Sequence, residues 1–207
     1  NMGARWSEGV LVGYNRSSNT FIVVTEDGKI SVRSISRYPE QTRWSDESLA
    51  KIKARIKATR QAGARAGIYM HLVGMDDGSE AFFPKLSDAR LVTPDGQPME
   101  FPWQGIDVKG TAWQMSMAAP EWRDHLLQQA RWIMEILQPD AIVIDETFAG
   151  LGYDEHPQRR GPLSAHSIGF FKEMRALVRS FGKDRALLAS DCGMSGFALW
   201  ADGEGGD

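Results

Sequence analysis

Acidic residues follow three successive apolar runs in the second half of the sequence, and these residues are Asp145 with Glu146, then Asp191, then Asp202. An Asp after a strand often does no more than begin a turn or cap the next helix. Three such positions in succession favour a site lined with carboxylates. Active sites of parallel α/β folds lie at the carboxyl ends of the strands.

Side-chain alternation in the run 141–144 predicts which acid faces the site. Successive side chains of a strand point to opposite faces, so Val143 and Asp145 share one face, and Ile142 and Ile144 share the other with Glu146. The bulkier isoleucines suit a layer of helices. We therefore expect Asp145 to point into the mouth of the site, with Glu146 as the fallback.

Two carboxylates at this spacing could cleave a glycosidic bond. Neighbouring strands lie about 4.8 Å apart, so backbones separated by one intervening strand are roughly 10 Å apart and their side chains can converge. Glycosidic cleavage uses carboxyl groups about 5–9 Å apart, one as nucleophile or base and the other as a proton donor whose pKa is raised. Asp145 and Asp202 fit this arrangement, and Glu146 and Asp191 are further candidates.

Residues near the predicted strand ends could bind a sugar, and the candidates are Tyr69, His71, Trp113, Trp200 and Glu204. Flat aromatic rings stack on sugar faces, but core packing is the competing interpretation for each of them. His71 could donate a hydrogen bond to a sugar hydroxyl or be a buried, satisfied histidine.

Alternating helices and short apolar strands must position these residues. Helical periodicity follows Ser45, Pro120 and Ser164, with stops at Gly63, Pro139 and Gly182. Short apolar runs predict strands at 66–72, 111–117, 141–144, 186–189 and 197–201. This alternation predicts an α/β fold, a partial (β/α)8 TIM-type barrel over residues 43–207.

Residues 1–42 form a separate small β segment in this prediction. Apolar and β-branched runs over 8–38, with a turn signal at Asp27-Gly28, indicate an antiparallel meander of about three strands.

Composition excludes several classes of protein. The net charge of −3 gives no basic footprint for nucleic acid, and Cys192, the single cysteine, rules out a disulfide framework. No run approaches the roughly 20 apolar residues of a membrane span. We expect no cofactor, because no phosphate loop or dinucleotide fingerprint occurs. The acidic stretches 76–80 and 154–156 lack the spacing of known metal motifs.

Four stretches, GIYMH (67–71), MSMAAPEW (115–122), IDET (144–147) and WADGE (200–204), resemble barrel glycoside hydrolases, and most of all the retaining α-galactosidase and α-glucosidase clan. The resemblance implies a nucleophilic Asp after the fourth barrel strand and an acid/base Asp after the sixth. With 67–72 taken as strand two, these become Asp145 and Asp202. The Lys that precedes the nucleophile in the clan is replaced here by Val143 or Ile144. Residues 9–40 faintly resemble the SH3-like module of copia-type retroelement polyproteins.

We therefore expect a carbohydrate substrate and, in the full-length protein, a glycosidase that acts on O-glycosyl bonds. A complete barrel usually needs about 250 residues, so the 207-residue chain is expected to be a fragment. The alternatives are a non-catalytic carbohydrate-binding or retroelement-derived fusion fragment, and a metal-dependent hydrolase that uses the same acids. The sugar, the linkage, retention or inversion, the compartment and the oligomeric state are left open.

Overall fold

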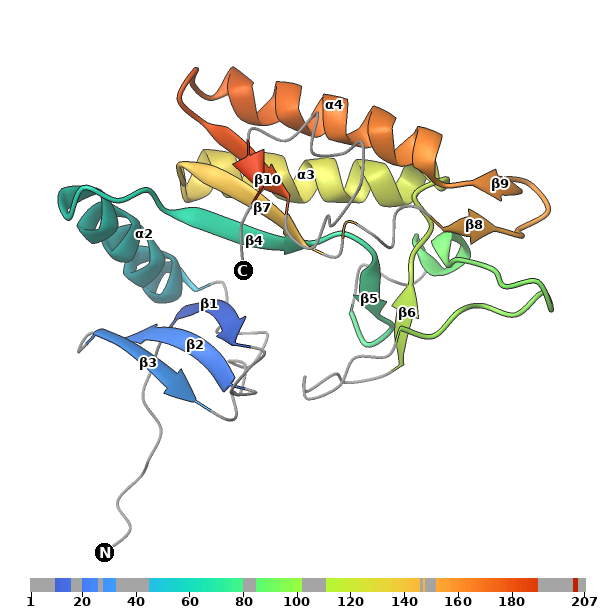
Figure 1. The fold of residues 1–207 in the computed structure, drawn as a ribbon, viewed down its shortest axis with the longest axis horizontal. Coiled ribbons are helices and arrows are strands. Elements are labelled where there is room, and N and C mark those ends of the chain that lie inside the picture. The colour runs from blue at the N-terminus through green and yellow to red at the C-terminus, as the bar shows by residue number, and fades with distance from the viewer. Residues whose placement is uncertain are drawn as a thin grey trace, which may run out of the picture. The chain divides into compact units, whose positions relative to one another are not determined.

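The computed structural model describes residues 10–15, 20–25, 28–32, 45–79, 85–101, 111–145, 147, 152–189 and 203–204. The chain divides into two compact units, one of residues 1–52 with 104–107 and one of residues 53–103 with 108–207. Figure 1 shows the elements of each unit.

The first unit holds the antiparallel meander expected from the sequence. Strands β1 (Val10–Asn15), β2 (Thr20–Thr25) and β3 (Gly28–Val32) pair in the order β1-β2-β3. The register of β1 against β2 shifts between Leu11 and Gly13, which marks a bulge. Sequence alternation and the glycine at the start of β3 thus predict this small sheet correctly.

The second unit is built on a parallel sheet of four strands in the order β11-β10-β7-β4. These are β4 (Gly67–His71), β7 (Ala141–Asp145), β10 (Ala186–Ala189) and β11 (Gly203–Glu204). Each neighbouring pair is parallel. The prediction of an α/β fold with a parallel sheet is confirmed, and within the described residues the sheet does not close into a barrel.

Three helices follow the predicted starts closely: α2 (Asp46–Gln61), α3 (Pro120–Ile136) and α4 (Ser164–Ser180). The Ser45 hydroxyl accepts the Ser48 N–H at 3.3 Å, as an N-cap does. Ser164 differs from its predicted role, because it is the first helical residue and no side chain caps this helix. Gly63 has a φ of +79°, the left-handed conformation that ends a helix.

Helices α3 and α4 lie side by side on one face of the sheet (Figure 1). On that face Ile68 is half-buried, and the other strand residues are buried: Met70, Ile142, Ile144, Leu187 and Ala189. The indole N–H of Trp122 in α3 donates to the carbonyl of Leu72 at 2.9 Å and ties the helix to the end of β4. The core of the second unit therefore lies between this helix pair and the sheet.

The opposite face of the sheet is more open. Val143 and Asp145 are half-buried, whereas Ile142 and Ile144 have exposed fractions of 0% and 1%. A Cβ built on Gly67 would lie 2.9 Å from a methyl group of Val143, which places both residues on the same face. The predicted alternation of this strand is thus confirmed.

The run 111–117 is not a strand of the parallel sheet, contrary to the sequence prediction. Only 112–114 are extended, as β6 (Ala112–Gln114), and they pair antiparallel with β5 (Gly74–Asp76) in a separate sheet. Strand β4 pairs directly with β7. The apolar residues that follow β6 are buried as irregular chain before α3, and a short apolar run alone does not distinguish these states.

The remaining short elements belong to the two loops that leave the carboxyl ends of β4 and β7. They are the 3₁₀ turn η1 (Ser87–Ala89), β8 (Tyr153–Asp154) and β9 (Gly161–Pro162). Isolated bridges, such as Glu100 with Trp113, add to the small sheet β5–β6. In Figure 1 all these elements lie on the side toward which β4 and β7 run.

The predicted strand over 197–201 cannot be compared with the structure, which describes only a short strand directly after it. A strand was expected over 197–201 with Asp202 at its end, but residues 190–202 lie outside the described residues. The described strand β11 begins at Gly203, directly after Asp202. Its Glu204 pairs with Ala189 of β10, which in turn pairs with Ile144.

A carboxylate at the amino end of β7 holds the strands in register. Asp140 accepts the Ala66 N–H at 3.0 Å, the Arg60 Nε at 3.0 Å and the Arg185 Nη1 at 2.9 Å. These donors come from the segments before β4 and β10 and from the end of α2. Burial raises the pKa of Asp140, but the hydrogen bonds and the charges of Arg60 and Arg185 outweigh it and leave the pKa lowered.

We predict that Asp140→Asn lowers the free energy of unfolding at pH 7 by about 1.5–3 kcal/mol, the range for hydrogen bonds to a charged group. Because the folded-state pKa is depressed, this stabilisation is present above the unfolded value of about 3.9 and is lost as the pH falls through the folded value. Denaturant unfolding should therefore show the difference from wild type shrinking below about pH 4. Asp124→Asn, at an exposed position of α3, is the matched control and should change little.

Candidate functional site

The carboxyl ends of β4 and β7 bring two predicted site residues together. His71 and Asp145 are register partners on neighbouring parallel strands, and both are half-buried. Strands in a sheet lie about 4.8 Å apart, so the two side chains can serve one bound group. Both stand on the face of the sheet that α3 and α4 do not cover. The structure thus makes the two residues neighbours, and their roles in a site stay predictions.

Local contacts fix the imidazole of His71. The backbone N–H of Gly74 donates to Nδ1 at 3.0 Å, just past the end of β4. The ring of Phe101 meets the imidazole edge to face, with centroids 5.2 Å apart and an interplanar angle of 88°. The loop that carries β5 and β6 thus supplies both contacts.

Tyr69 stands on the same face of the sheet, two residues before His71. It pairs in register with Val143 and is 55% exposed, the highest value among the large hydrophobic residues described. An exposed ring beside a carboxylate is a suitable stacking surface for a sugar.

Trp113 lies elsewhere, in the small antiparallel sheet. Its indole N–H donates to Asp77 at 3.0 Å, and the Arg90 guanidinium lies 4.9 Å from its ring centroid. Asp77 also accepts the Thr111 N–H at 2.9 Å. These contacts hold Trp113 within the loop, and its role in binding a sugar stays a prediction.

The structure does not describe the side chains of the other predicted site residues. Glu146, Asp191, Trp200 and Asp202 lie outside the described residues, and Glu204 is described only as backbone of β11. The sheet order nevertheless leaves a single strand, β10, between β7 and β11. If β7 is counted as strand four of a barrel, then β4 is strand three rather than two, and β11 is strand six.

A buried carboxylate, that of Asp154, joins the loop that follows β4 to the loop that follows β7. In the sequence this residue was considered only as a weak candidate for metal binding. Asp154 of β8 is fully buried and accepts hydrogen bonds from Ser116 Oγ at 2.6 Å and Arg159 Nε at 2.8 Å. It also accepts the backbone N–H groups of Val92 and His156 at 3.2 and 3.0 Å. Nothing in the local sequence distinguishes this Asp from a solvated one.

Arg159 extends the same network. Its Nη2 donates to the carbonyls of Asp88 and Arg90, each at 2.7 Å. Burial raises the pKa of Asp154, but the bonds from Ser116 and the backbone, with the Arg159 charge, more than reverse this and lower the pKa. A carboxylate held charged by this many donors is a structural anchor and a poor proton donor.

In both acidic stretches considered for metal binding, a carboxylate accepts hydrogen bonds from within the protein. Asp76 accepts the Gly78 N–H at 2.7 Å, and Asp154 is part of the buried anchor. Among the described residues no group of three or more His, Cys, Asp or Glu side chains could hold a metal ion. No described helix has the length and apolar character needed to cross a membrane.

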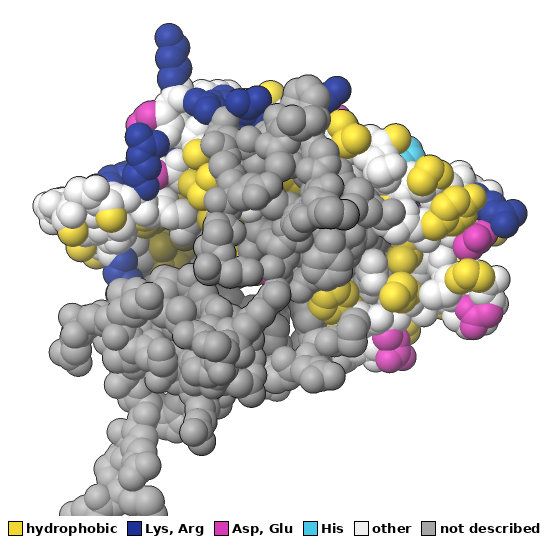
Figure 2. All heavy atoms as spheres, in the orientation of Figure 1, with side chains coloured by type: hydrophobic (Ala, Val, Ile, Leu, Met, Phe, Trp, Pro, Cys, Tyr) yellow, Lys and Arg dark blue, Asp and Glu magenta, His cyan; other side chains and the backbone are white. Residues whose placement is uncertain are grey.

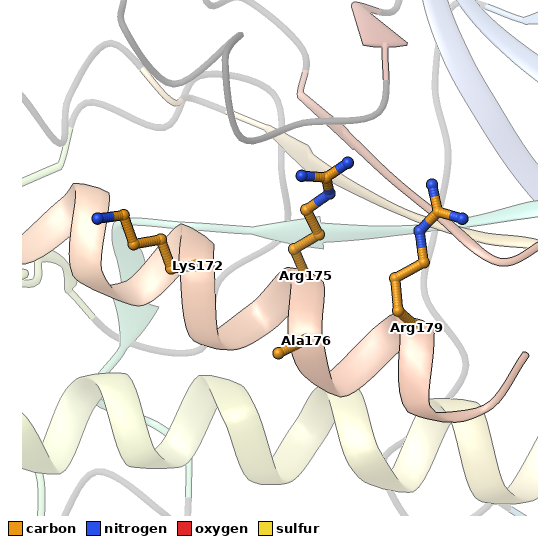
Figure 3. Close-up of a pocket in the computed structure, with 4 residues that line it drawn as sticks. All are labelled: Lys172, Arg175, Ala176 and Arg179. Carbon is orange, nitrogen blue, oxygen red and sulfur yellow. The ribbon is translucent and has the colours of Figure 1, made fainter. Parts of the chain in front are cut away.

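A shallow pocket of about 320 Å³ lies on the outer side of α4, away from the candidate site. The described residues that line it are Lys172, Arg175, Ala176 and Arg179, and Figure 3 shows the three basic side chains extending from one side of the helix. The space-filling view places Lys and Arg along the same upper edge (Figure 2). The helix layer separates this pocket from the face of Asp145.

Comparison with known proteins supports a fold of the glycoside hydrolase type. No protein-family model matches the sequence, and no curated protein matches it. A Paenibacillus cycloisomaltooligosaccharide glucanotransferase, complexed with cycloisomaltoheptaose, matches 86% of this chain at 13% identity and a TM-score of 0.53. An alpha-N-acetylgalactosaminidase from Bifidobacterium bifidum, complexed with GalNAc, matches 69% of this chain at 14% identity and a TM-score of 0.52. An alpha-galactosidase from Thermus thermophilus, complexed with stachyose, matches 74% at 20% identity and a TM-score of 0.48.

The chain spans 23%, 21% and 30% of the lengths of these three proteins. At such identities the likeness concerns the fold alone. It defines the class as a mixed α/β protein with a glycoside hydrolase-like fold. The resemblance of residues 9–40 to a retroelement module finds no support in these comparisons.

We predict that Asp154→Ala lowers the free energy of unfolding by about 3–5 kcal/mol, because it leaves Arg159, whose side chain is only 13% exposed, without its carboxylate. The adjacent residue offers a matched control. Glu155 pairs with Arg160 at 2.7 Å, but the Arg160 side chain is 66% exposed, so Glu155→Ala should cost less than about 1 kcal/mol. Denaturant unfolding of the two variants provides the measurement, and similar losses in both would contradict the anchor role of Asp154.

Proposed function

We propose that this chain is part of a glycoside hydrolase whose site lies at the carboxyl edge of the parallel sheet. The observation that carries the proposal is the position of Asp145, which ends β7 on the face opposite the helices and level with His71. Active sites of α/β barrels lie at this edge. The fold shared with known glycoside hydrolases supports the same assignment.

In the proposed mechanism Asp145 is the nucleophile and Asp202 the acid/base. The Asp202 carboxyl group gives its proton to the glycosidic oxygen, and the Asp145 carboxylate forms a bond to the anomeric carbon as the bond to the leaving group breaks. Asp202 then takes a proton from water, which displaces Asp145 and releases the sugar. Glu146 is the fallback for Asp145, and Asp191 is a further candidate acid of the same edge.

The neighbouring side chains would bind the sugar. Tyr69 offers an exposed ring on the same face as Asp145, and His71 offers a ring nitrogen level with it. Trp200 is proposed to complete the subsite from the side of β11. Glu204 is a further candidate, but the register supports it less, because it pairs with Ala189 and through it with Ile144, on the face covered by the helices. Trp113 would contribute only from the β5–β6 loop, where its indole N–H already donates to Asp77.

We predict that Asp145→Asn and Asp202→Asn each abolish glycoside cleavage, a loss of at least about 10²-fold as is usual when a catalytic acid or base is removed. The variants should be made in the full-length protein. They should be assayed on p-nitrophenyl α-D-galactopyranoside, stachyose and cycloisomaltoheptaose, ligands of the structurally similar enzymes.

Asp95→Asn is the control for this experiment, because Asp95 lies on an exposed turn of the β5–β6 loop and its substitution should leave the activity unchanged. Retained activity in Asp145→Asn or in Asp202→Asn would remove the role proposed for that residue. Loss of activity with a chelator would instead favour a metal-dependent hydrolase that uses the same acids.

A second candidate function is carbohydrate binding without turnover, including a fusion fragment with an incomplete barrel. It is favoured by a sheet that does not close into a barrel within the described residues, and by the small share of each similar enzyme that this chain spans. Calorimetric titration of the 207-residue chain with the same sugars separates the two. Binding without hydrolysis in both this chain and the full-length protein would support the second function.

A further inference from the structure

The loop between β4 and α3 reaches back to His71 through two independent contacts. Gly74, the first residue of β5, donates its N–H to Nδ1 of the imidazole, and Phe101 packs its ring against the same imidazole. Phe101 is itself fixed, since its N–H donates to the carbonyl of Ala112 in β6 at 2.8 Å. The orientation of His71 therefore depends on the β5–β6 sheet as well as on β4.

The contact with Gly74 specifies the tautomer of His71. A backbone N–H can only donate a hydrogen bond, so Nδ1 must carry a lone pair. The proton of the neutral ring then resides on Nε2, because a neutral imidazole has one donor and one acceptor nitrogen. His71 consequently offers a hydrogen-bond donor at Nε2.

Phe101 acts on the ring torsion. The χ2 angle of histidine has a broad, roughly two-fold preference, and a half-turn exchanges Nδ1 with a carbon atom. The edge-to-face contact with Phe101, at an interplanar angle of 88°, restricts this rotation. One contact therefore selects the tautomer and the other limits the rotation of the ring.

We propose that His71 donates a hydrogen bond from Nε2–H to a hydroxyl group of the sugar held at Asp145, and that Gly74 and Phe101 are positioning residues for this donor. The donor role rests on the proposed glycosidase function, whereas the tautomer and its dependence on the loop do not. The register pairing of His71 with Asp145 puts the donor within one strand spacing, about 4.8 Å, of the carboxylate strand.

The tautomer is measured directly by nitrogen-15 NMR of histidine side chains in the full 207-residue chain. The chain has four histidines, and the His71 signals are those missing from His71→Asn. We expect a single tautomer with the proton on Nε2. A proton on Nδ1, or an even mixture of the tautomers in the wild-type chain, would overturn the proposal.

Phe101→Ala tests the positioning role of the loop. It should broaden or mix the His71 signals, because the ring then loses the edge-to-face contact that restricts its rotation. Met99→Ala is the matched control, since Met99 is an exposed residue of the same loop whose backbone N–H donates to Leu91. Unchanged His71 signals in Phe101→Ala would remove Phe101 from the proposal.

Two isosteric variants test the donor in binding. His71→Asn keeps an acceptor near the position of Nδ1 but loses the donor, whereas His71→Gln keeps an amide donor near the position of Nε2. We expect His71→Asn to bind D-galactose or D-glucose about tenfold more weakly, as the loss of one hydrogen bond predicts, and His71→Gln to retain more of the affinity. Equal affinity of wild type and His71→Asn would overturn the donor role.

The two experiments fail in different ways. If the wild-type chain binds neither sugar while NMR shows the proton on Nε2, the proposed function and the donor role are contradicted and the positioning by the loop stands. If sugars bind but the proton resides on Nδ1, the proposed function stands and the inference about His71 is wrong.

Discussion

The register of the parallel sheet depends on one carboxylate, that of Asp140, which gathers donors from the segments preceding β4 and β10 and from the end of α2. Its backbone serves the same purpose, since its N–H donates to Ala66 and its carbonyl accepts the N–H of Ala186. Because these segments are held together at the amino edge, the strands that follow begin in register with one another. The pairing of His71 with Asp145 at the carboxyl edge is a consequence of this constraint.

Two aspartates with lowered pKa values thus stabilise opposite ends of the sheet. Asp140 aligns the strands, and Asp154 joins the loops that leave β4 and β7. Both carboxylates are surrounded by donors that favour the charged form. A carboxylate that must take up and release a proton needs the opposite environment, so these two acids are unsuited to the role of acid/base, for which the acids of the carboxyl edge are the better candidates.

The sequence predicted those parts of the structure that depend on local periodicity. The three helices, the buried strand ending at Asp145 and its alternation follow from spacing and side-chain volume. The run 111–117 was assigned wrongly to the parallel sheet, because its burial comes from packing before α3, which a short apolar run does not encode. Asp154 and its partner Ser116 lie 38 positions apart, and no local sequence pattern predicts a contact between residues so distant in the chain.

The open face of the sheet carries three levels of side chains that differ in character. At the amino edge Gly67, Ala141 and Ala186 are register partners and are small. The next level on this face holds the larger Tyr69, Val143 and Leu188, and the level at the carboxyl edge holds His71 and Asp145. Barrel interiors fill their lower layers with packed side chains and place polar groups at the carboxyl end. A surface used only for packing would have no reason to end in two polar strand neighbours, so this gradient favours a site at the carboxyl edge.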